Sequence, residues 1–452
     1  MPRKAGARLP QPLFSEPKFN EDGKPTPDPQ TFRTPHDQTK DSQLYKQIGA
    51  LLTKDTVSFP ALRGNQSDVF QLSAAFGSHG PAEIKAIQDS GKIVLHMAGD
   101  TGASIQSKLR NELSVADHLT NDFHTSKLDD RPSFLFHLGD LIYNFGESQY
   151  YYDQFYEPFR NYAAPIFAIP GNHDSFVVPG TSANDAPLNT FMRNFCSKAP
   201  VVTKEAGSLH RTAMTQPGVY FALDAPFVRI IGLFSNALED PGVISSQAGQ
   251  QAKWPGVPNY QLNFLAAQLK RVKSEKYAGA LIIAVHHPPF AYAPPQGQHG
   301  AGGHHSGSTT MLRDIDSICS AQGVYPHAFI SGHVHNYQRF TRKLRFGGSE
   351  YSVPFIISGD GGHNVLSLVE SRGGVTPPKP KRGARVTYLD SIPAVNSTEL
   401  TIDNFDDQHY GYLRLTADNK LLRIDFHAAD NNASPPPTAD SVTIDIASHT
   451  LA

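Results

Sequence analysis

Side chains that bind metal ions recur at one kind of position in this sequence, directly after short apolar runs. Each run ends in a small cluster of Gly, Asp, Asn or His. Carboxylate, amide and imidazole groups are all ligands that metal ions accept in proteins. The sequence therefore predicts a metal centre assembled from separate loops. Its candidate ligands are Asp100, Asp140, Tyr143, Asn172, His286, His333 and His335.

This set of candidates is too large for one four-coordinate ion. It suits two ions that share a bridging carboxylate, and ions about 3.5–4 Å apart can hold both the entering and the leaving oxygen of a phosphoryl transfer. In "GHVH" (332–335) an extended backbone would point His333 and His335 to the same side. The glycines before Asp100, Asp140, Asn172 and His333 would let the backbone turn sharply and would leave room for the ions.

Tyr143 bears on the identity of the metal. A phenol has a pKa of about 10, so it binds as phenolate at neutral pH only beside a strong Lewis acid. The cofactor expected is therefore Fe(III) plus a second divalent ion, for which Fe, Zn and Mn are all candidates. Two carboxylates, one phenolate and a bridging hydroxide would offset most of the charge of the trivalent and divalent ions. About one positive charge would remain to attract phosphate. Two divalent ions with Tyr143 uncoordinated remain the alternative.

The apolar runs themselves predict an α/β protein. Runs that are apolar on both faces are typical of buried strands, and open α/β sheets place their sites at the carboxyl ends of such strands. Periodicity predicts helices over 41–52, 80–91 and 259–272. Two hairpins are expected, one over 219–234 turning at 224–226 and one over 410–426 turning near 417–419. The predicted strands lie in 92–100, 133–140, 164–174, 280–288, 327–335 and 353–362.

The composition argues against several classes of partner. The 452 residues carry a formal net charge of −2, so no overall field favours nucleic acid or a membrane. The apolar runs are too short to span a bilayer. The two cysteines, Cys196 and Cys319, provide no disulfide framework and are expected to be buried thiols. Residues 1–43 are Pro-rich and polar, as in a draped or disordered arm.

The compartment is not fixed by the sequence. The N-terminus has no apolar segment of the kind found in signal peptides, which makes the cytoplasm the default expectation. A secreted protein whose signal has been removed remains the alternative. The oligomeric state is likewise left open.

Five motifs resemble those of the calcineurin-like metallophosphoesterases. They are "GDTG" (99–102), "GDLIY" (139–143), "GNHD" (171–174), "VHHP" (285–288) and "GHVHNYQR" (332–339). Within that superfamily the chain is most similar to purple acid phosphatases, because Tyr143 is present and the usual Asp-x-His is replaced by Asp100-Thr101-Gly102. The resemblance spans about residues 92–449. It implies a four-layer α/β/β/α sandwich with two mixed β-sheets, formed by a catalytic domain over 92–452 after a Pro-rich, partly helical extension over 1–91.

The resemblance also implies roles for individual residues. A hydroxide bound to the ions would attack phosphorus in line, and His173 would contact the phosphate. A histidine of the loop that holds His299, His304 and His305 could protonate the leaving group. The trivalent ion would be held by Asp100, Asp140, Tyr143 and His335, and the divalent ion by Asp140, Asn172, His286 and His333.

The expected function is hydrolysis of small phosphate monoesters of the acid phosphatase type. A phosphodiesterase or nucleotide hydrolase on the same scaffold remains an alternative, as does a non-catalytic metal-binding protein. A non-catalytic protein would be expected to lack one of the metal ligands, and all seven candidates are present in this sequence. His287 and His363 could orient ligands or only pack. The histidines expected to be satisfied inside the core are His96, His137 and His327.

Overall fold

The computed structural model describes most of the chain after residue 66. The described residues are 43, 60–62, 67–177, 186–207, 209–235, 242–245, 257–292, 307–369, 374, 376–386, 396–429 and 438–452. The predicted arm over 1–43 and the predicted helix over 41–52 lie outside them, apart from Gln43.

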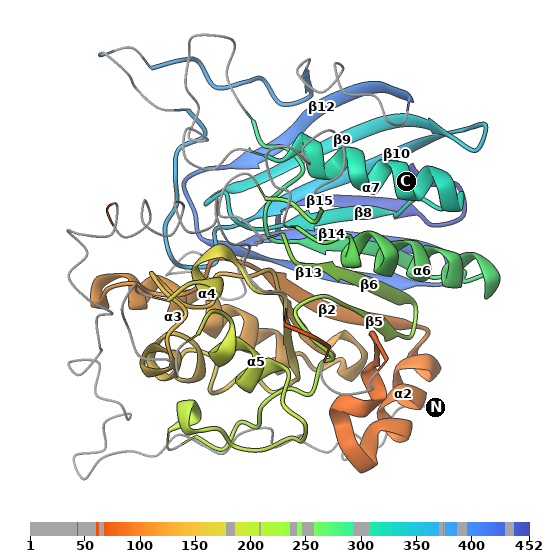
Figure 1. The fold of residues 1–452 in the computed structure, drawn as a ribbon. Coiled ribbons are helices and arrows are strands. Elements are labelled where there is room, and N and C mark those ends of the chain that lie inside the picture. Colours follow the sequence, from red (N-terminus) through yellow and green to blue (C-terminus); the bar gives the residue numbers. More distant parts are fainter. Residues whose placement is uncertain are drawn as a thin grey trace.

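Two β-sheets form the centre of the molecule (Figure 1). Both combine parallel and antiparallel neighbours, so the predicted mixed α/β fold with two mixed sheets is confirmed. The nine-stranded sheet runs β1 (Val69–Gln71), β5 (Phe221–Ala225), β6 (Val228–Leu233), β7 (Ala280–Val285), β8 (Ala328–Ser331), β10 (Ser349–Ser358), β9 (Tyr337–Phe346), β12 (Asn396–Asp406), β11 (Ala384–Arg385). The seven-stranded sheet runs β16 (Thr450–Leu451), β15 (Thr438–Asp445), β14 (Leu421–Ala428), β13 (Gly411–Asp418), β2 (Lys92–Ala98), β3 (Leu135–His137), β4 (Ile166–Ala168).

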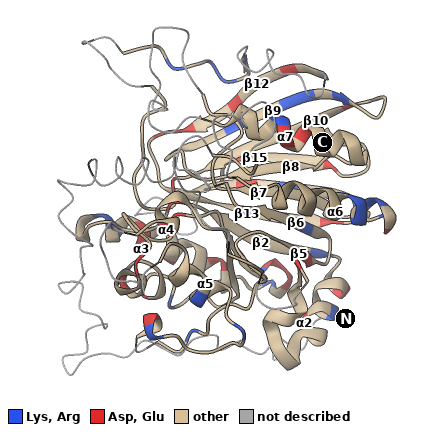
Figure 2. Cartoon of the chain, viewed as in Figure 1, with Lys and Arg blue, Asp and Glu red and all other residues tan. Residues whose placement is uncertain are grey.

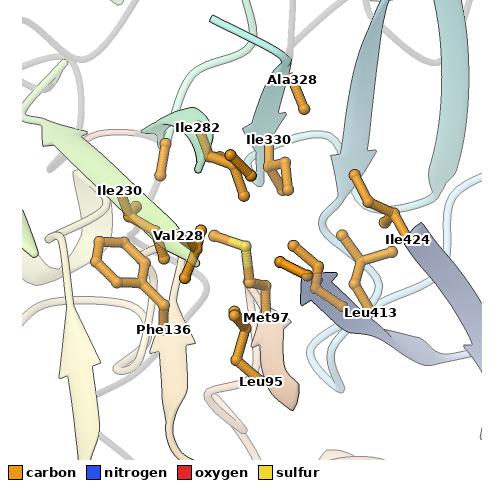
Figure 3. Close-up of a cluster of buried hydrophobic side chains, with 14 of the residues drawn as sticks. Leu95, Met97, Phe136, Val228, Ile230, Ile282, Ala328, Ile330, Leu413 and Ile424 are labelled. Atoms are coloured by element: carbon orange, nitrogen blue, oxygen red, sulfur yellow. The ribbon is translucent and has the colours of Figure 1, made fainter. Parts of the chain in front are cut away.

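Apolar side chains on both faces of the strands hold the layers together. Leu95 and Met97 of β2 point into the space between the sheets, where they meet Ile230 and Ile282 from the other sheet (Figure 3). The neighbouring Ala98 instead faces the outer layer, as the alternation of a strand requires. This two-sided burial is why the strands read as continuous apolar runs in the sequence.

Helices cover the outer face of each sheet. The buried faces of α6 and α7 pack on the nine-stranded sheet, and that of α3 packs on the seven-stranded one, which gives the four layers expected (Figure 1). In the described part of the chain after residue 66, the α-helices are α2 (Gly80–Ser90), α3 (Gln106–Asn121), α4 (Asn172–Ser175), α5 (Asn189–Phe195), α6 (Tyr260–Ser274) and α7 (Thr309–Gln322). Short helical turns are η3 (Leu72–His79), η4 (Asp122–His124), η5 (Leu128–Asp130), η6 (Ser148–Tyr150), η7 (Tyr152–Tyr156) and η9 (Lys204–Ala206).

The helices predicted over 80–91 and 259–272 are confirmed as α2 and α6. Helix α2 has Pro81 in its first turn and ends at Gly91, which is left-handed with φ 75°. In α6 the predicted stripe of Leu262, Leu265, Leu269 and Val272 is buried. Over the described part of the chain, no helix has both the length and the apolar character that crossing a membrane requires.

Both predicted hairpins form, with their turns shifted toward the C-terminus. The β5–β6 turn lies at Pro226-Phe227, because Asp224 stays in the ladder opposite Arg229 and bonds the Arg271 guanidinium at 2.6 and 2.8 Å. The β13–β14 turn lies at 419–420, where the carboxylate of Asp418 accepts hydrogen bonds from the next backbone N–H groups.

The described part of the N-terminal extension packs into the central core. Strand β1 pairs in parallel with β5 at the edge of the nine-stranded sheet. Phe70, Leu72, Phe76 and Ile87 belong to the same buried apolar cluster as Leu95 and Met97 of β2. The division of the chain at residue 91 stays a prediction.

The buried polar residues expected from the sequence have partners. His96 contacts Asp122 at 2.9 Å, His137 contacts the Thr101 hydroxyl at 3.0 Å, and His327 accepts from the Leu281 N–H at 2.8 Å. The prediction of satisfied core histidines is confirmed.

Both cysteines are buried free thiols, also as predicted. Figure 2 shows Lys and Arg interspersed with Asp and Glu along the described elements.

Candidate metal centre

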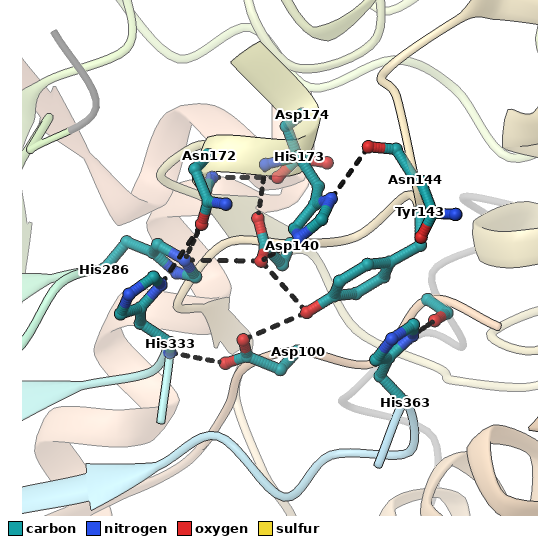
Figure 4. Close-up of polar contacts among 12 residues, drawn as sticks. Asp100, Asp140, Tyr143, Asn144, Asn172, His173, Asp174, His286, His333 and His363 are labelled. Atoms are coloured by element: carbon teal, nitrogen blue, oxygen red, sulfur yellow. Dashed lines mark hydrogen bonds and ion pairs between the residues drawn. The ribbon is translucent and has the colours of Figure 1, made fainter. Parts of the chain in front are cut away.

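All seven predicted metal ligands lie close together in the structure. Figure 4 labels each of them except His335. They lie on the segments that follow β2, β3 and β4 of one sheet and β7 and β8 of the other, at the carboxyl ends of these strands. All seven residues are buried, with exposed fractions from 0% to 5%. The fold thus brings together residues that are up to 235 positions apart in the chain.

One group of donors gathers around the hydroxyl of Tyr143. The hydroxyl lies 2.9 Å from Asp140 Oδ2, 3.1 Å from Asp100 Oδ1 and 3.3 Å from His335 Nε2. Donor atoms that share one ion at bond lengths near 2.1 Å lie about 3 Å from each other. These four side chains therefore have the spacing of a single coordination sphere.

A second group gathers around the side-chain oxygen of Asn172. Asn172 Oδ1 lies 3.0 Å from His286 Nε2 and 3.2 Å from His333 Nδ1, and His286 Nε2 lies 3.4 Å from Asp140 Oδ2. Asp140 Oδ2 therefore belongs to both groups. Within the described residues, donor atoms of Asp100, Asp140 and His286 all lie within 4.8 Å of one another.

His173 lies at the rim of the first group. Its Nδ1 donates to the carbonyl oxygen of Asn144 at 2.7 Å, and its Nε2 lies 4.0 Å from Asp140 Oδ2. The imidazole is 13% exposed. His299, His304 and His305 lie outside the described residues, so their predicted role stays a prediction.

Three of the seven side chains sit on left-handed backbone. Asp100, Asp140 and His333 have φ of 58°, 56° and 68°, a region that non-glycine residues rarely occupy. Such conformations persist where the surroundings fix them, and they gather at functional sites. Here the Asp100 N–H donates to Gly139 O at 2.9 Å, and the His333 N–H donates to Asp100 Oδ2 at 2.8 Å.

The extended conformation predicted for "GHVH" is wrong. The left-handed His333 and the tight contacts Val334 N–H to Gly332 O (2.8 Å) and Asn336 N–H to Val334 O (2.7 Å) bend the segment. Because of this bend, His333 joins the Asn172 group and His335 joins the Tyr143 group.

Glycines beside the site leave room for the carboxylates. A Cβ at residue 332 would lie 2.5 Å from Asp100 Oδ2, and a Cβ at residue 171 would overlap Asp140 Oδ1 and its backbone nitrogen. The sequence suggested room for ions. The structure shows that the space is filled by the side chains that would bind them.

Gly171→Ala is expected to lower the phosphate ester hydrolysis that the sequence predicts by about 10²-fold, because displacing catalytic groups by about 1 Å has an effect of that size. The added methyl group must displace Asp140, because it would overlap the carboxylate and the backbone nitrogen of that residue. Steady-state kinetics would measure the loss. Gly218→Ala is the control, since the closest contact of its Cβ would be the tip of the Leu62 side chain at 2.9 Å. Equal activity of the two variants would contradict the conclusion that residue 171 must be glycine because Asp140 lies against it.

Two residues that the sequence analysis missed hold the ligand loops in place. The Asp174 carboxylate accepts from the backbone N–H groups of Leu141 (3.1 Å), Ile142 (3.1 Å) and Gly171 (2.9 Å). The Gln154 side chain brackets the backbone of Tyr143, donating to its carbonyl oxygen at 2.6 Å and accepting from its N–H at 2.8 Å. An acid three residues into a helix is a known cap, so Asp174 could have been recognised in "GNHD".

The electrostatics of the centre favour a bound cation. Burial raises the pKa of Asp100 to about 7. Burial also acts to raise the pKa of Asp140, but the imidazoles of His286 and His173 lower it overall. The pKa of Tyr143 is raised well above its usual value by burial and then by the two carboxylates. Buried acidic groups of this kind are stabilised by ions, and this oxygen and nitrogen donor set fits a pair of metal ions.

A comparison with protein family models also relates this chain to a known family. A family model described as calcineurin-like phosphoesterase matches residues 97–337, which is more than half of the chain and includes all seven predicted ligands. The comparison with curated proteins found no significant match.

Three of the solved structures that match this chain have low sequence identity and TM-scores below 0.5. GAP50, the anchor in the inner membrane complex of Plasmodium, is 11% identical, with a TM-score of 0.47 over 78% of this chain and 89% of that one. PhoD is 13% identical, with a TM-score of 0.45 over 79% and 71% of the two chains. A predicted phosphoesterase from Streptococcus pneumoniae is 11% identical, with a TM-score of 0.25 over 78% and 98%.

Proposed function

The chain belongs to the calcineurin-like phosphoesterase family, and on that basis we propose that it hydrolyses small phosphate monoesters at a binuclear metal centre of the purple acid phosphatase type. The observation that carries the proposal is the shared carboxylate: Asp140 Oδ2 lies 2.9 Å from the Tyr143 hydroxyl and 3.4 Å from His286 Nε2. One residue thereby joins two groups of four donors.

The donor types assign an ion to each group. The group with a phenol and two carboxylates suits Fe(III), because a phenol needs a strong Lewis acid to bind as phenolate. The group with an amide, two imidazoles and one shared carboxylate suits a divalent ion such as Fe, Zn or Mn. When bound, the two ions would lower the pKa of a water molecule and draw charge from the phosphoryl oxygens.

The protein's own residues supply the remaining contacts. Because Nδ1 of His173 is held by Asn144 O, its Nε2 is turned toward the centre, where it could donate a hydrogen bond to a phosphoryl oxygen. The leaving group needs a proton, and the histidine-rich loop holding His299, His304 and His305 is our candidate source.

Charge favours a monoester over a diester. Two carboxylates and a phenolate do not neutralise a trivalent and divalent pair, and with a bridging hydroxide about one positive charge remains. A monoester dianion is attracted by that charge more strongly than a diester monoanion. A phosphodiesterase would need to favour the diester monoanion over the monoester dianion. No contact among the described residues supports that preference.

The experiment compares an aryl phosphate with the matching bis-aryl phosphate on the metal-loaded protein. We expect the larger kcat/KM for the monoester, complete loss of activity on chelation, and recovery on adding iron and zinc. Faster turnover of the diester would assign the phosphodiesterase alternative. Full activity in a metal-free protein would reject the binuclear mechanism altogether.

A further inference from the structure

His363 stacks directly on the ring of Tyr143. It lies in "GDGGH" (359–363), just after β10, and its ring centroid is 3.5 Å from that of Tyr143, with 14° between the planes (Figure 4). His173 also packs on the Tyr143 ring, at 4.2 Å and 41°, and the two imidazole centroids are 6.5 Å apart. The phenol is therefore flanked by two imidazoles, which restrict the plane of its ring.

Hydrogen bonds fix the tautomer of His363. Its Nδ1 lies 2.8 Å from Gly102 O, and since a carbonyl oxygen only accepts, Nδ1 must carry the proton. Its Nε2 lies 3.1 Å from Lys108 Nζ, and since an ammonium group only donates, Nε2 must accept. The imidazole is therefore neutral, with both nitrogens engaged and neither left to bind a metal ion.

Lys108 brings a positive charge to this side of the centre. It lies in the first turn of α3 and is half-buried. Burial lowers the pKa of Lys108 only to about 8, so the ammonium form prevails at neutral and acidic pH. An imidazole that accepts a hydrogen bond from an ammonium group is depleted of electrons, and an electron-poor ring is attracted to an electron-rich ring stacked on it.

The stacked imidazole also reaches a second member of the same donor group. The His363 ring packs edge-on against His335, with centroids 5.3 Å apart and 71° between the planes. His363 thus contacts two of the four residues proposed to hold the trivalent ion. It is 6% exposed, so solvent does not compete strongly for these contacts.

We propose that His363, polarised by Lys108, is a positioning residue that sets the ring plane of Tyr143 and withdraws electron density from its phenolate. This inference rests on the proposed function, since it concerns Tyr143 bound to Fe(III). The ring plane decides which oxygen orbital faces the ion, and the electron density on the ring decides how readily charge moves from phenolate to iron.

The test is the visible charge-transfer band of the iron-loaded protein. In Lys108→Met we expect the band to move to longer wavelength, because the phenolate gives up charge more easily. His363→Phe should show a similar shift, because it keeps a stacked ring but cannot accept from Lys108. His363→Ala should give a weaker and broader band, because only His173 then restricts the plane of the Tyr143 ring. Lys108→Arg should restore the wild-type position.

Arg110→Met is the matched control, since it removes the same charge from an exposed position two residues further along α3. Its band should not move. The inference is overturned if Lys108→Met and His363→Phe both keep the wild-type band, or if Arg110→Met shifts it equally. A colourless wild-type protein that still hydrolyses the aryl phosphate would overturn this inference and the ferric assignment, while the proposed phosphatase activity would stand.

Discussion

Asp140→Asn is expected to remove both metal ions together and to lower hydrolysis of an aryl phosphate by about 10³-fold or more. Each ion supplies several kcal/mol of charge stabilisation in the transition state, and about 4 kcal/mol corresponds to that factor. A single oxygen of Asp140, Oδ2, contacts side-chain donor atoms of both groups, Tyr143 at 2.9 Å and His286 at 3.4 Å. The amide keeps the shape of the side chain but removes the charge that both ions need.

The measurement is metal content per chain alongside kcat/KM. Asp89→Asn makes the same chemical change at an exposed position on α2 and should leave both quantities unaltered. The variant should keep its secondary structure by circular dichroism. If Asp140→Asn retains both ions, or loses only one of them, then the shared carboxylate is not the bridge.

Arg342→Met is expected to destabilise the fold by about 3–5 kcal/mol, the usual effect of breaking a buried ion pair by removing one partner. Arg342 on β9 donates to both oxygens of Asp316 on α7 at 3.0 and 2.8 Å, and it also donates to the Tyr325 hydroxyl at 2.8 Å. The two charged side chains are 2% and 1% exposed. Methionine fills much of the volume but leaves the Asp316 carboxylate buried without its cation.

The adjacent Lys343 provides the control. Its ion pair with Glu399 is 3.0 Å long, but the two side chains are 44% and 37% exposed. Lys343→Met should therefore lower stability by less than about 1 kcal/mol. Urea unfolding gives both values. Similar free energies of unfolding for the two variants would show that the buried pair contributes no more than the exposed one.

The sequence predicted the parts of the fold that local patterns determine. The runs around Met97, Phe136 and Ile282 are apolar on both faces because they lie between a second sheet and a helical layer, and that burial is visible in composition alone. The helix over 259–272 was found for a similar reason, because its buried stripe has helical spacing. The seven predicted ligands come together because each follows such a strand.

Other features depend on contacts between distant residues and could not be predicted in this way. The bend at His333 is fixed by the carboxylate of Asp100, which lies 233 positions earlier. The turn after β5 is displaced by ion pairs of Asp224 with Arg229 and Arg271. Neither interaction leaves a local pattern, so the extended "GHVH" and the earlier turn were reasonable local predictions that tertiary contacts overrode.

His363 illustrates the same limit within the site. Its spacing from Gly359-Asp360 gave no reason to place it on Tyr143, since the stack joins residues that are 220 positions apart in the chain. Lys108 is similar, because nothing local links the first turn of α3 to the loop after β10. Asp174 is the exception, since capping chemistry could have identified it from four consecutive residues.

The central claim is that Asp100, Asp140, Tyr143, Asn172, His286, His333 and His335 hold an iron ion and a divalent ion side by side. The most direct measurement is elemental analysis of the purified protein together with its visible spectrum, on the wild type and on Tyr143→Phe. The account predicts two ions per wild-type chain, at least one of them iron, and a visible band that disappears in Tyr143→Phe. A single ion per chain, or a band that survives in Tyr143→Phe, would contradict it.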